Sequence, residues 1–207
     1  MRSPPIRHGA IVLVTAIVLL GLPLGGQIRS VAANAEQQVW VHYDYMVAPD
    51  GRSDAPNPES IQLVVDAFAA HGIQLHIDPA HAAIPAHRII IPDFIPGFPK
   101  NACPGFDQVN FTDLKAQYFH PTANHEWHYV IFGDYSYLGG YCDFAFGTGV
   151  SWIPGNDFVV TLGHLRDIGL PITPYVEGGS FMHELGHNLG LRHGAVWMTT
   201  SSRTTSA

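Results

Sequence analysis

The sequence predicts an α/β domain, with α+β as its mixed-sheet form, and two observations lead to that fold class. Segments dense in β-branched and aromatic residues alternate with segments of helical periodicity, and turn residues separate them. At 207 residues with 46% hydrophobic content, the chain is also long enough to bury one core of ordinary size. Alternating strands and helices around one sheet favour this architecture over a β-sandwich, and the sequence contains no internal repeat.

The first predicted elements are a strand and a helix joined by a loop. Residues 39–45 have the Val, Trp and Tyr content of a strand, and residues 49–58 are rich in turn formers. A helix then begins near Pro58 and ends at His71-Gly72. Its apolar stripe has the i, i+3, i+4, i+7 spacing of a buried helical face and consists of Ile61, Val64, Val65 and Phe68.

Later segments predict four more strands and a short helix. Residues 73–77 alternate apolar and polar side chains, which is typical of a strand with one buried face. The other strands are predicted at residues 88–91, 127–132 and 157–162, and the short helix by the spacing of Phe111, Leu114 and Tyr118.

The first 35 residues have the pattern of a secretory signal peptide. A positive n-region precedes an apolar h-region at residues 10–22, and Ala33-Asn34-Ala35 is a small-residue cleavage signal. The alternative is an uncleaved membrane anchor, but this apolar run is shorter than the roughly 20 residues that span a bilayer. We therefore expect a secreted protein without stable membrane insertion, with residues 36–198 as the domain of the mature chain and the Ser/Thr-rich residues 199–207 as a tail.

The cysteine count and the charge narrow the class further. Cys103 and Cys142 are the two cysteines, and in an exported chain such a pair more often forms a disulfide than a reactive site. A disulfide between them would close a loop of about 40 residues, which would stabilise the fold by roughly 3 to 4 kcal/mol. A latency switch, in which Cys103 ligates a metal, is the alternative. The formal net charge is −7 with no basic run, which excludes a nucleic-acid partner, and we expect a monomer.

The chemistry is concentrated in one segment, where His183, Glu184, His187, Gly190 and His193 form H-E-x-x-H-x-x-G-x-x-H. On a helix, histidines four residues apart lie on one face and can bind one metal ion. A glycine can then adopt positive φ, end the helix and return the chain so that the third histidine arrives. Three protein ligands plus water is the ligand set of a catalytic Zn²⁺, and the glutamate beside the first ligand is placed to act as general base.

The competing interpretation is a buried helix whose histidines only satisfy hydrogen bonds, and it must place all five residues by accident. We expect Ser180 to cap the motif helix after Gly178-Gly179. Met182, Leu185 and Leu189 then form a stripe that faces the core. Two other groups, His76 with Asp78 and His125 with His128, have spacings that could hold a second metal but are not diagnostic of one.

The motif resembles the signature of the metzincin clan of zinc endopeptidases, and the string from Phe181 to Gly194 is similar to a bacterial secreted group within it. The resemblance implies a metzincin-like zincin domain: a twisted, mostly parallel sheet, an antiparallel edge strand beside the cleft and an active-site helix. It implies zinc ligation by His183, His187 and His193, with Glu184 as general base. Residues 157–162 are the candidate edge, against which a peptide or protein substrate would lie by strand addition.

The chain departs from the metzincin pattern after His193. Metzincins carry there a subdomain with a methionine turn beneath the zinc, whereas 14 residues follow here and Met198 is the one methionine among them. We interpret this end as a truncated or frame-shifted terminus. The leading expectation is a secreted zinc-dependent endopeptidase. The alternatives are a truncated zinc-binding protein without activity and a zinc hydrolase of non-peptide esters or amides.

Overall fold

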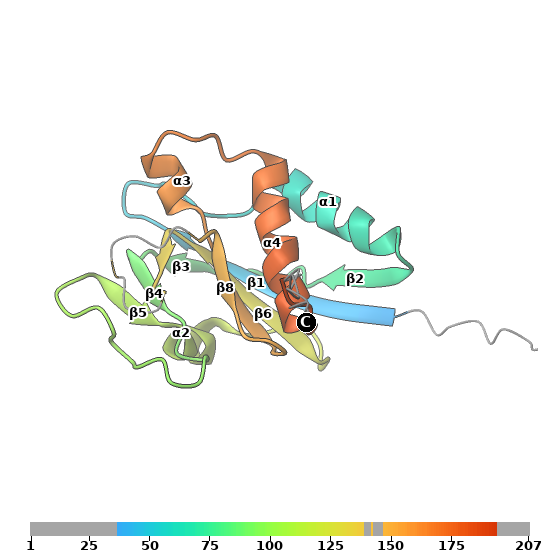
Figure 1. The fold of residues 1–207 in the computed structure, drawn as a ribbon, viewed down its shortest axis with the longest axis horizontal. Coiled ribbons are helices and arrows are strands. Elements are labelled where there is room, and N and C mark those ends of the chain that lie inside the picture. The colour runs from blue at the N-terminus through green and yellow to red at the C-terminus, as the bar shows by residue number, and fades with distance from the viewer. Residues whose placement is uncertain (1–36, 139–141, 143–146, 194–207) are drawn as a thin grey trace, which may run out of the picture. The chain divides into compact units, whose positions relative to one another are not determined.

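The computed structural model describes residues 37–138, 142 and 147–193 of the chain, and the predicted signal peptide and Ser/Thr-rich tail lie outside these ranges. Two sheets and four helices are present in this part of the chain (Figure 1). The strands are β1 (Gln37–Val47), β2 (Ile73–Ile77), β3 (Ala83–Pro85), β4 (Ile89–Ile91), β5 (Gln108–Asn110), β6 (Trp127–Gly133), β7 (Tyr135–Ser136), β8 (Gly149–Ser151) and β9 (Asp157–Thr161). The helices are α1 (Pro58–Ala69), α2 (Phe111–Tyr118), α3 (Gly163–Asp167) and α4 (Pro174–Asn188).

The larger sheet has the order β2-β1-β6-β9-β8, and β3 also pairs with β1. Every pairing in it is parallel except the one between β8 and β9, so β8 is an antiparallel strand at the edge. The predicted fold class is therefore confirmed. Against the expectation of one sheet, β4 pairs with β5 and β7 in a second, three-stranded parallel sheet.

Both faces of the larger sheet are covered, because side chains alternate between two cores. Val130 and Phe132 of β6 pack with Val64 of α1 and with Phe181 and Leu185 of α4. The alternate residues of β6, Tyr129 and Ile131, face the opposite way. Together with Val159 of β9 they pack against α2 and β4. Figure 1 shows α1 and α4 side by side on one face of the sheet and α2 toward the other.

One strand assignment was wrong in its role. Residues 157–162 were expected to form the edge strand, but β9 lies inside the sheet between β6 and β8. Four of its five residues are buried, which is typical of a central strand with both faces covered. The edge is the shorter β8, whose sequence Gly-Val-Ser has too few apolar residues to predict a strand.

The start of α4 also differs from the prediction. The helix begins at Pro174, and its N-cap is Thr173, whose hydroxyl accepts from the Val176 amide at 3.3 Å. Ser180 lies inside the helix, where its hydroxyl donates to the Val176 carbonyl at 2.8 Å. Gly178 is needed there for close packing, because a Cβ at this position would lie 2.8 Å from the Ser60 carbonyl of α1. Gly178 therefore marks a contact between helices, and neither glycine marks a helix boundary.

The expected apolar stripe of this helix is wrong in two of its three residues. Leu185 is fully buried, as predicted, but Met182 and Leu189 are 42% and 39% exposed. The apolar contacts to the sheet come instead from Phe181 and Leu185, which are four residues apart. The buried face of α4 therefore differs from the predicted one, and Met182 and Leu189 line a hollow beside the histidines.

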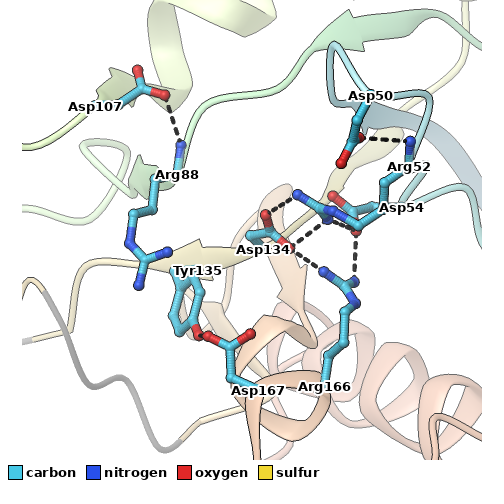
Figure 2. A network of polar contacts seen from close by, with 9 residues as sticks. All are labelled: Asp50, Arg52, Asp54, Arg88, Asp107, Asp134, Tyr135, Arg166 and Asp167. Atoms are coloured by element: carbon cyan, nitrogen blue, oxygen red, sulfur yellow. Dashed lines mark hydrogen bonds and ion pairs between the residues drawn. The ribbon is translucent and has the colours of Figure 1, made fainter.

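Ion pairs join helix α3 to the loop between β1 and α1 (Figure 2). Arg52 donates to both carboxylate oxygens of Asp134, at 2.7 and 2.5 Å, in a bidentate pair. Arg166 of α3 donates to the same carboxylate and, at 2.8 Å, to Asp54. Burial comes first among the causes that raise the pKa of Asp54, followed by the charge of Asp134, and the two guanidinium groups oppose them. The network fixes α3 against the β6–β7 turn.

The disulfide prediction is confirmed, since Cys103 and Cys142 are bonded with their Cα atoms 5.5 Å apart. It ties the loop before β5 to the segment that follows Leu138. No helix in the described part of the chain is both long and apolar enough to span a bilayer.

A single carboxylate joins α4 to α1 and gives a stability prediction. Glu177 accepts from the Ser60 hydroxyl at 2.6 Å and from the Asn57 amide at 2.7 Å, and Ser60 is buried. We expect Glu177→Ala to lower the free energy of unfolding by about 2 to 3 kcal/mol, because both donors lose a charged acceptor. Urea denaturation measures this, with the exposed Glu59→Ala as the control, expected to change stability by less than about 0.5 kcal/mol. If the two substitutions lowered the free energy of unfolding equally, the hydrogen bonds of Glu177 would not be what stabilises the contact between α4 and α1.

Candidate metal centre

The three motif histidines meet at one point in the structure. Their Nε2 atoms are 3.1 Å apart between His183 and His187, 3.1 Å between His187 and His193, and 2.9 Å between His193 and His183. Three such nitrogens cannot satisfy one another with hydrogen bonds, because each neutral ring has one proton and one lone pair. A cation held about 2.0 to 2.1 Å from each nitrogen satisfies all three lone pairs, so the donor set fits Zn²⁺.

The end of α4 brings the third histidine to the first two. Gly190 has a φ of 93°, in the left-handed region where a Cβ is strained, and its amide donates to the His187 carbonyl at 2.8 Å. The next amide, that of Leu191, donates to the Gly186 carbonyl at 2.9 Å. These bonds close the helix as the sequence predicted and leave His193 two residues later beside the helix axis.

One hydrogen bond orients the imidazole of His187. The Nδ1–H of His187 donates to the Leu191 carbonyl at 2.8 Å, and since a carbonyl only accepts, this ring carries its proton on Nδ1. Its Nε2 lone pair is thereby directed to the shared point, which is the usual orientation of a metal-binding imidazole. Burial, and then the charges of the other two rings, lower the pKa of His183, which favours the neutral form that a metal needs.

Glu184 lies in the same cleft as the histidines but makes no hydrogen bond in the described part of the chain. Its side chain is buried, and burial raises the pKa of its carboxyl to about 7. Edge strand β8 approaches it closely: a Cβ built at Gly149 would lie 2.5 Å from Glu184 Cγ and 2.6 Å from the Val159 carbonyl oxygen. Position 149 therefore has no room for a side chain between Glu184 and the backbone of β9.

Two hollows flank the histidine cluster. The first, of about 710 Å³, lies between β8 and α4 and is lined by Gly149, Val150, Ser151, Glu184 and the three histidines, among others. The second, of about 700 Å³, lies between α1 and the end of α4 and is mainly apolar, with Phe68, Ile73, Met182, Leu189 and Leu191 in its lining. The shared point of the three imidazoles is therefore open to solvent and to ligands from both sides.

The structure brings together all four predicted site residues, and it adds two that the sequence did not indicate. Gly149 and Asn188 are these additions: Gly149 lies on β8, and the Asn188 side chain contacts Ser151 of that strand. No short motif marks either of them, because their importance depends on a strand that is distant in sequence. Among the described residues, the three motif histidines form the one group of three or more side chains placed to hold a metal. Neither His76 with Asp78 nor His125 with His128 forms such a group; His76 and His125 stack on the two faces of Trp40 instead.

Comparisons with known proteins leave the family of this chain open. No family model matches the sequence, and no curated protein matches it either. Among solved structures, the chain is similar to the crystal structure of archaemetzincin from Methanopyrus kandleri, with 17% sequence identity, 80% of each chain covered and a TM-score of 0.44. A likeness this distant carries no argument about activity.

The fit of Gly149 gives a prediction for this site. We expect Gly149→Ala to lower the free energy of unfolding by about 1 to 3 kcal/mol, because the added methyl group overlaps both Glu184 and the β9 backbone. Gly147→Ala is the matched control, since a Cβ there comes no nearer than 3.4 Å to another atom. Urea denaturation of the two variants beside the wild type measures the difference, and an unchanged midpoint for Gly149→Ala would refute the tight fit.

Proposed function

We propose that this chain is a secreted zinc-dependent endopeptidase. The observation that carries the proposal is the convergence of three Nε2 atoms within 3.1 Å of one another in a cleft that also holds a buried glutamate. The disulfide between Cys103 and Cys142 supports export, because such bonds persist in oxidising compartments.

Each site residue has a separate role in this mechanism. His183, His187 and His193 would hold the metal, and bound Zn²⁺ supplies a polarised substrate carbonyl and an acidified water. Glu184 takes a proton from the attacking water on a carboxylate oxygen and returns it to the nitrogen of the leaving amine. Its position suits both steps, because Glu184 lines the same cleft as the three histidines.

The substrate class follows from the free edge of the larger sheet. Strand β8 pairs with β9 alone among the described strands, and it lines the cleft together with Glu184. An extended peptide can add to such an edge through its backbone, so recognition depends on main-chain hydrogen bonds more than on side chains. This favours a polypeptide substrate over a small ester or amide.

Metal binding is the first test. We expect one zinc ion per chain by mass spectrometry under native conditions, and a higher melting temperature with zinc because the ion binds the folded state. We expect His187→Ala to weaken zinc binding by more than the about 10- to 100-fold that loss of a supporting hydrogen bond costs. The exposed His120→Ala is the control and should bind zinc like the wild type. Equal zinc affinity of His187→Ala and the wild type would exclude this ligand set.

Cleavage of casein is the second test, with and without a chelator. We expect chelator-sensitive cleavage by the wild type, and a rate about 10²- to 10⁴-fold lower for Glu184→Gln at full zinc content, because only the proton acceptor is removed. Glu126→Gln is the matched control, since Glu126 is exposed and outside the cleft. Zinc binding without casein cleavage would favour a zinc-binding module, and cleavage of small amides alone would favour a non-peptide hydrolase.

A further inference from the structure

In the described part of the chain, two residues of β8 have backbone hydrogen-bonding groups that pair with no other strand. In an antiparallel pair, hydrogen-bonded and non-hydrogen-bonded residue pairs alternate. The Thr161 amide donates to the Thr148 carbonyl at 2.9 Å, and Val150 lies opposite Val159 two residues further, so these are the hydrogen-bonded positions. Gly149 and Ser151 therefore direct their N–H and C=O groups away from β9. These groups are the ones that a bound peptide would pair with.

Asn188 holds the second of these residues in place. It follows the ligand His187 on α4, and its side chain is 2% exposed. Its amide nitrogen lies 2.6 Å from the Ser151 hydroxyl oxygen, 3.2 Å from the Trp152 carbonyl and 3.0 Å from the Asp157 carbonyl. The side chain therefore contacts the end of β8, the loop after it and the start of β9.

Further contacts fix the orientation of this amide. The Asn188 Oδ1 accepts from Nδ1 of His128 on β6 at 3.2 Å, so the amide nitrogen faces β8. Burial lowers the pKa of His128, which keeps this ring neutral. The Gly155 amide donates to the Asn188 carbonyl at 3.1 Å, so the backbone of the same residue holds the loop from its other side.

Taken with the proposed peptidase function, on which this step rests, the geometry points to Asn188 as a positioning residue that sets the register of the substrate-binding strand relative to the metal ligands. Gly149 lies against Glu184, and Ser151 lies two residues further along the strand, about 6.4 to 6.8 Å away. A peptide reaches Ser151 only if it extends at least three residues from the scissile bond on that side. Asn188 thus controls the use of long substrates through Ser151 and does not touch the substrate itself.

The test compares a long and a short peptide. Zinc-loaded wild type, Asn188→Asp and Ser151→Ala are assayed on an extended octapeptide cleaved at its centre and on a blocked dipeptide that cannot reach Ser151. Asn188→Asp keeps the size of the side chain but replaces the donor with a carboxylate that repels the two carbonyls. We expect KM for the octapeptide to rise more than kcat falls, and the long-to-short ratio of kcat/KM to fall by at least about tenfold, which corresponds to about 1.4 kcal/mol.

Ser151→Ala serves as the second variant, because it removes one acceptor of the Asn188 amide and leaves both carbonyl acceptors. We expect the same shift in the long-to-short ratio, smaller in size, with unchanged zinc content. A purely structural role would lower the melting temperature and both activities together. An unchanged long-to-short ratio in both variants overturns the inference about Asn188, while the peptidase function stands. If the wild type cleaves neither peptide in a chelator-sensitive way, the proposed function is overturned, and this inference with it.

Discussion

The site depends on the reversal of the chain at Gly190. His183 and His187 are placed by helix geometry alone, but the third imidazole reaches the same point only if the helix stops after Asn188 and the backbone turns at once. A φ of 93° is strained for any residue with a Cβ, so a glycine is required at that turn. The hydrogen bond from His187 to the Leu191 carbonyl spans the same turn, so one local structure both brings in the third histidine and orients the second.

The same helix also fixes the strand that borders the cleft. Gly149 fits against Glu184 without room for a Cβ, and Asn188 contacts Ser151 one turn further along the helix. Glu184 and the strand edge are therefore held at a constant separation, with Phe181 and Leu185 packing the same helix onto the sheet core. A peptide bound along β8 would meet Glu184 at a position set by these contacts and by none of its own side chains.

Helical and strand periodicity predicted the elements with strong apolar patterns, and the structure confirmed β1, α1, β2, β4, α2, β6 and β9 near the expected residues. Weak patterns failed: β8 has the sequence Gly-Val-Ser, and its strand conformation depends on pairing with β9. The prediction that residues 157–162 form the edge strand failed for a related reason. Whether this strand is central or at the edge depends on the pairing of β8 beside it, which the sequence pattern does not reveal. Ser180 was mistaken for a cap because Gly178 resembles a boundary, whereas its lack of a Cβ permits contact with Ser60.

The number of ligands bears on whether this centre is structural or catalytic. Structural zinc sites are closed by four protein ligands, whereas catalytic sites keep one position for water. In the described part of the chain three imidazoles converge, and the adjacent carboxylate of Glu184 faces strand β8 in the same cleft. Burial raises the pKa of the Glu184 carboxyl to about 7, and a carboxyl perturbed in this way inside a cleft is typical of a functional site, which favours the open kind of centre.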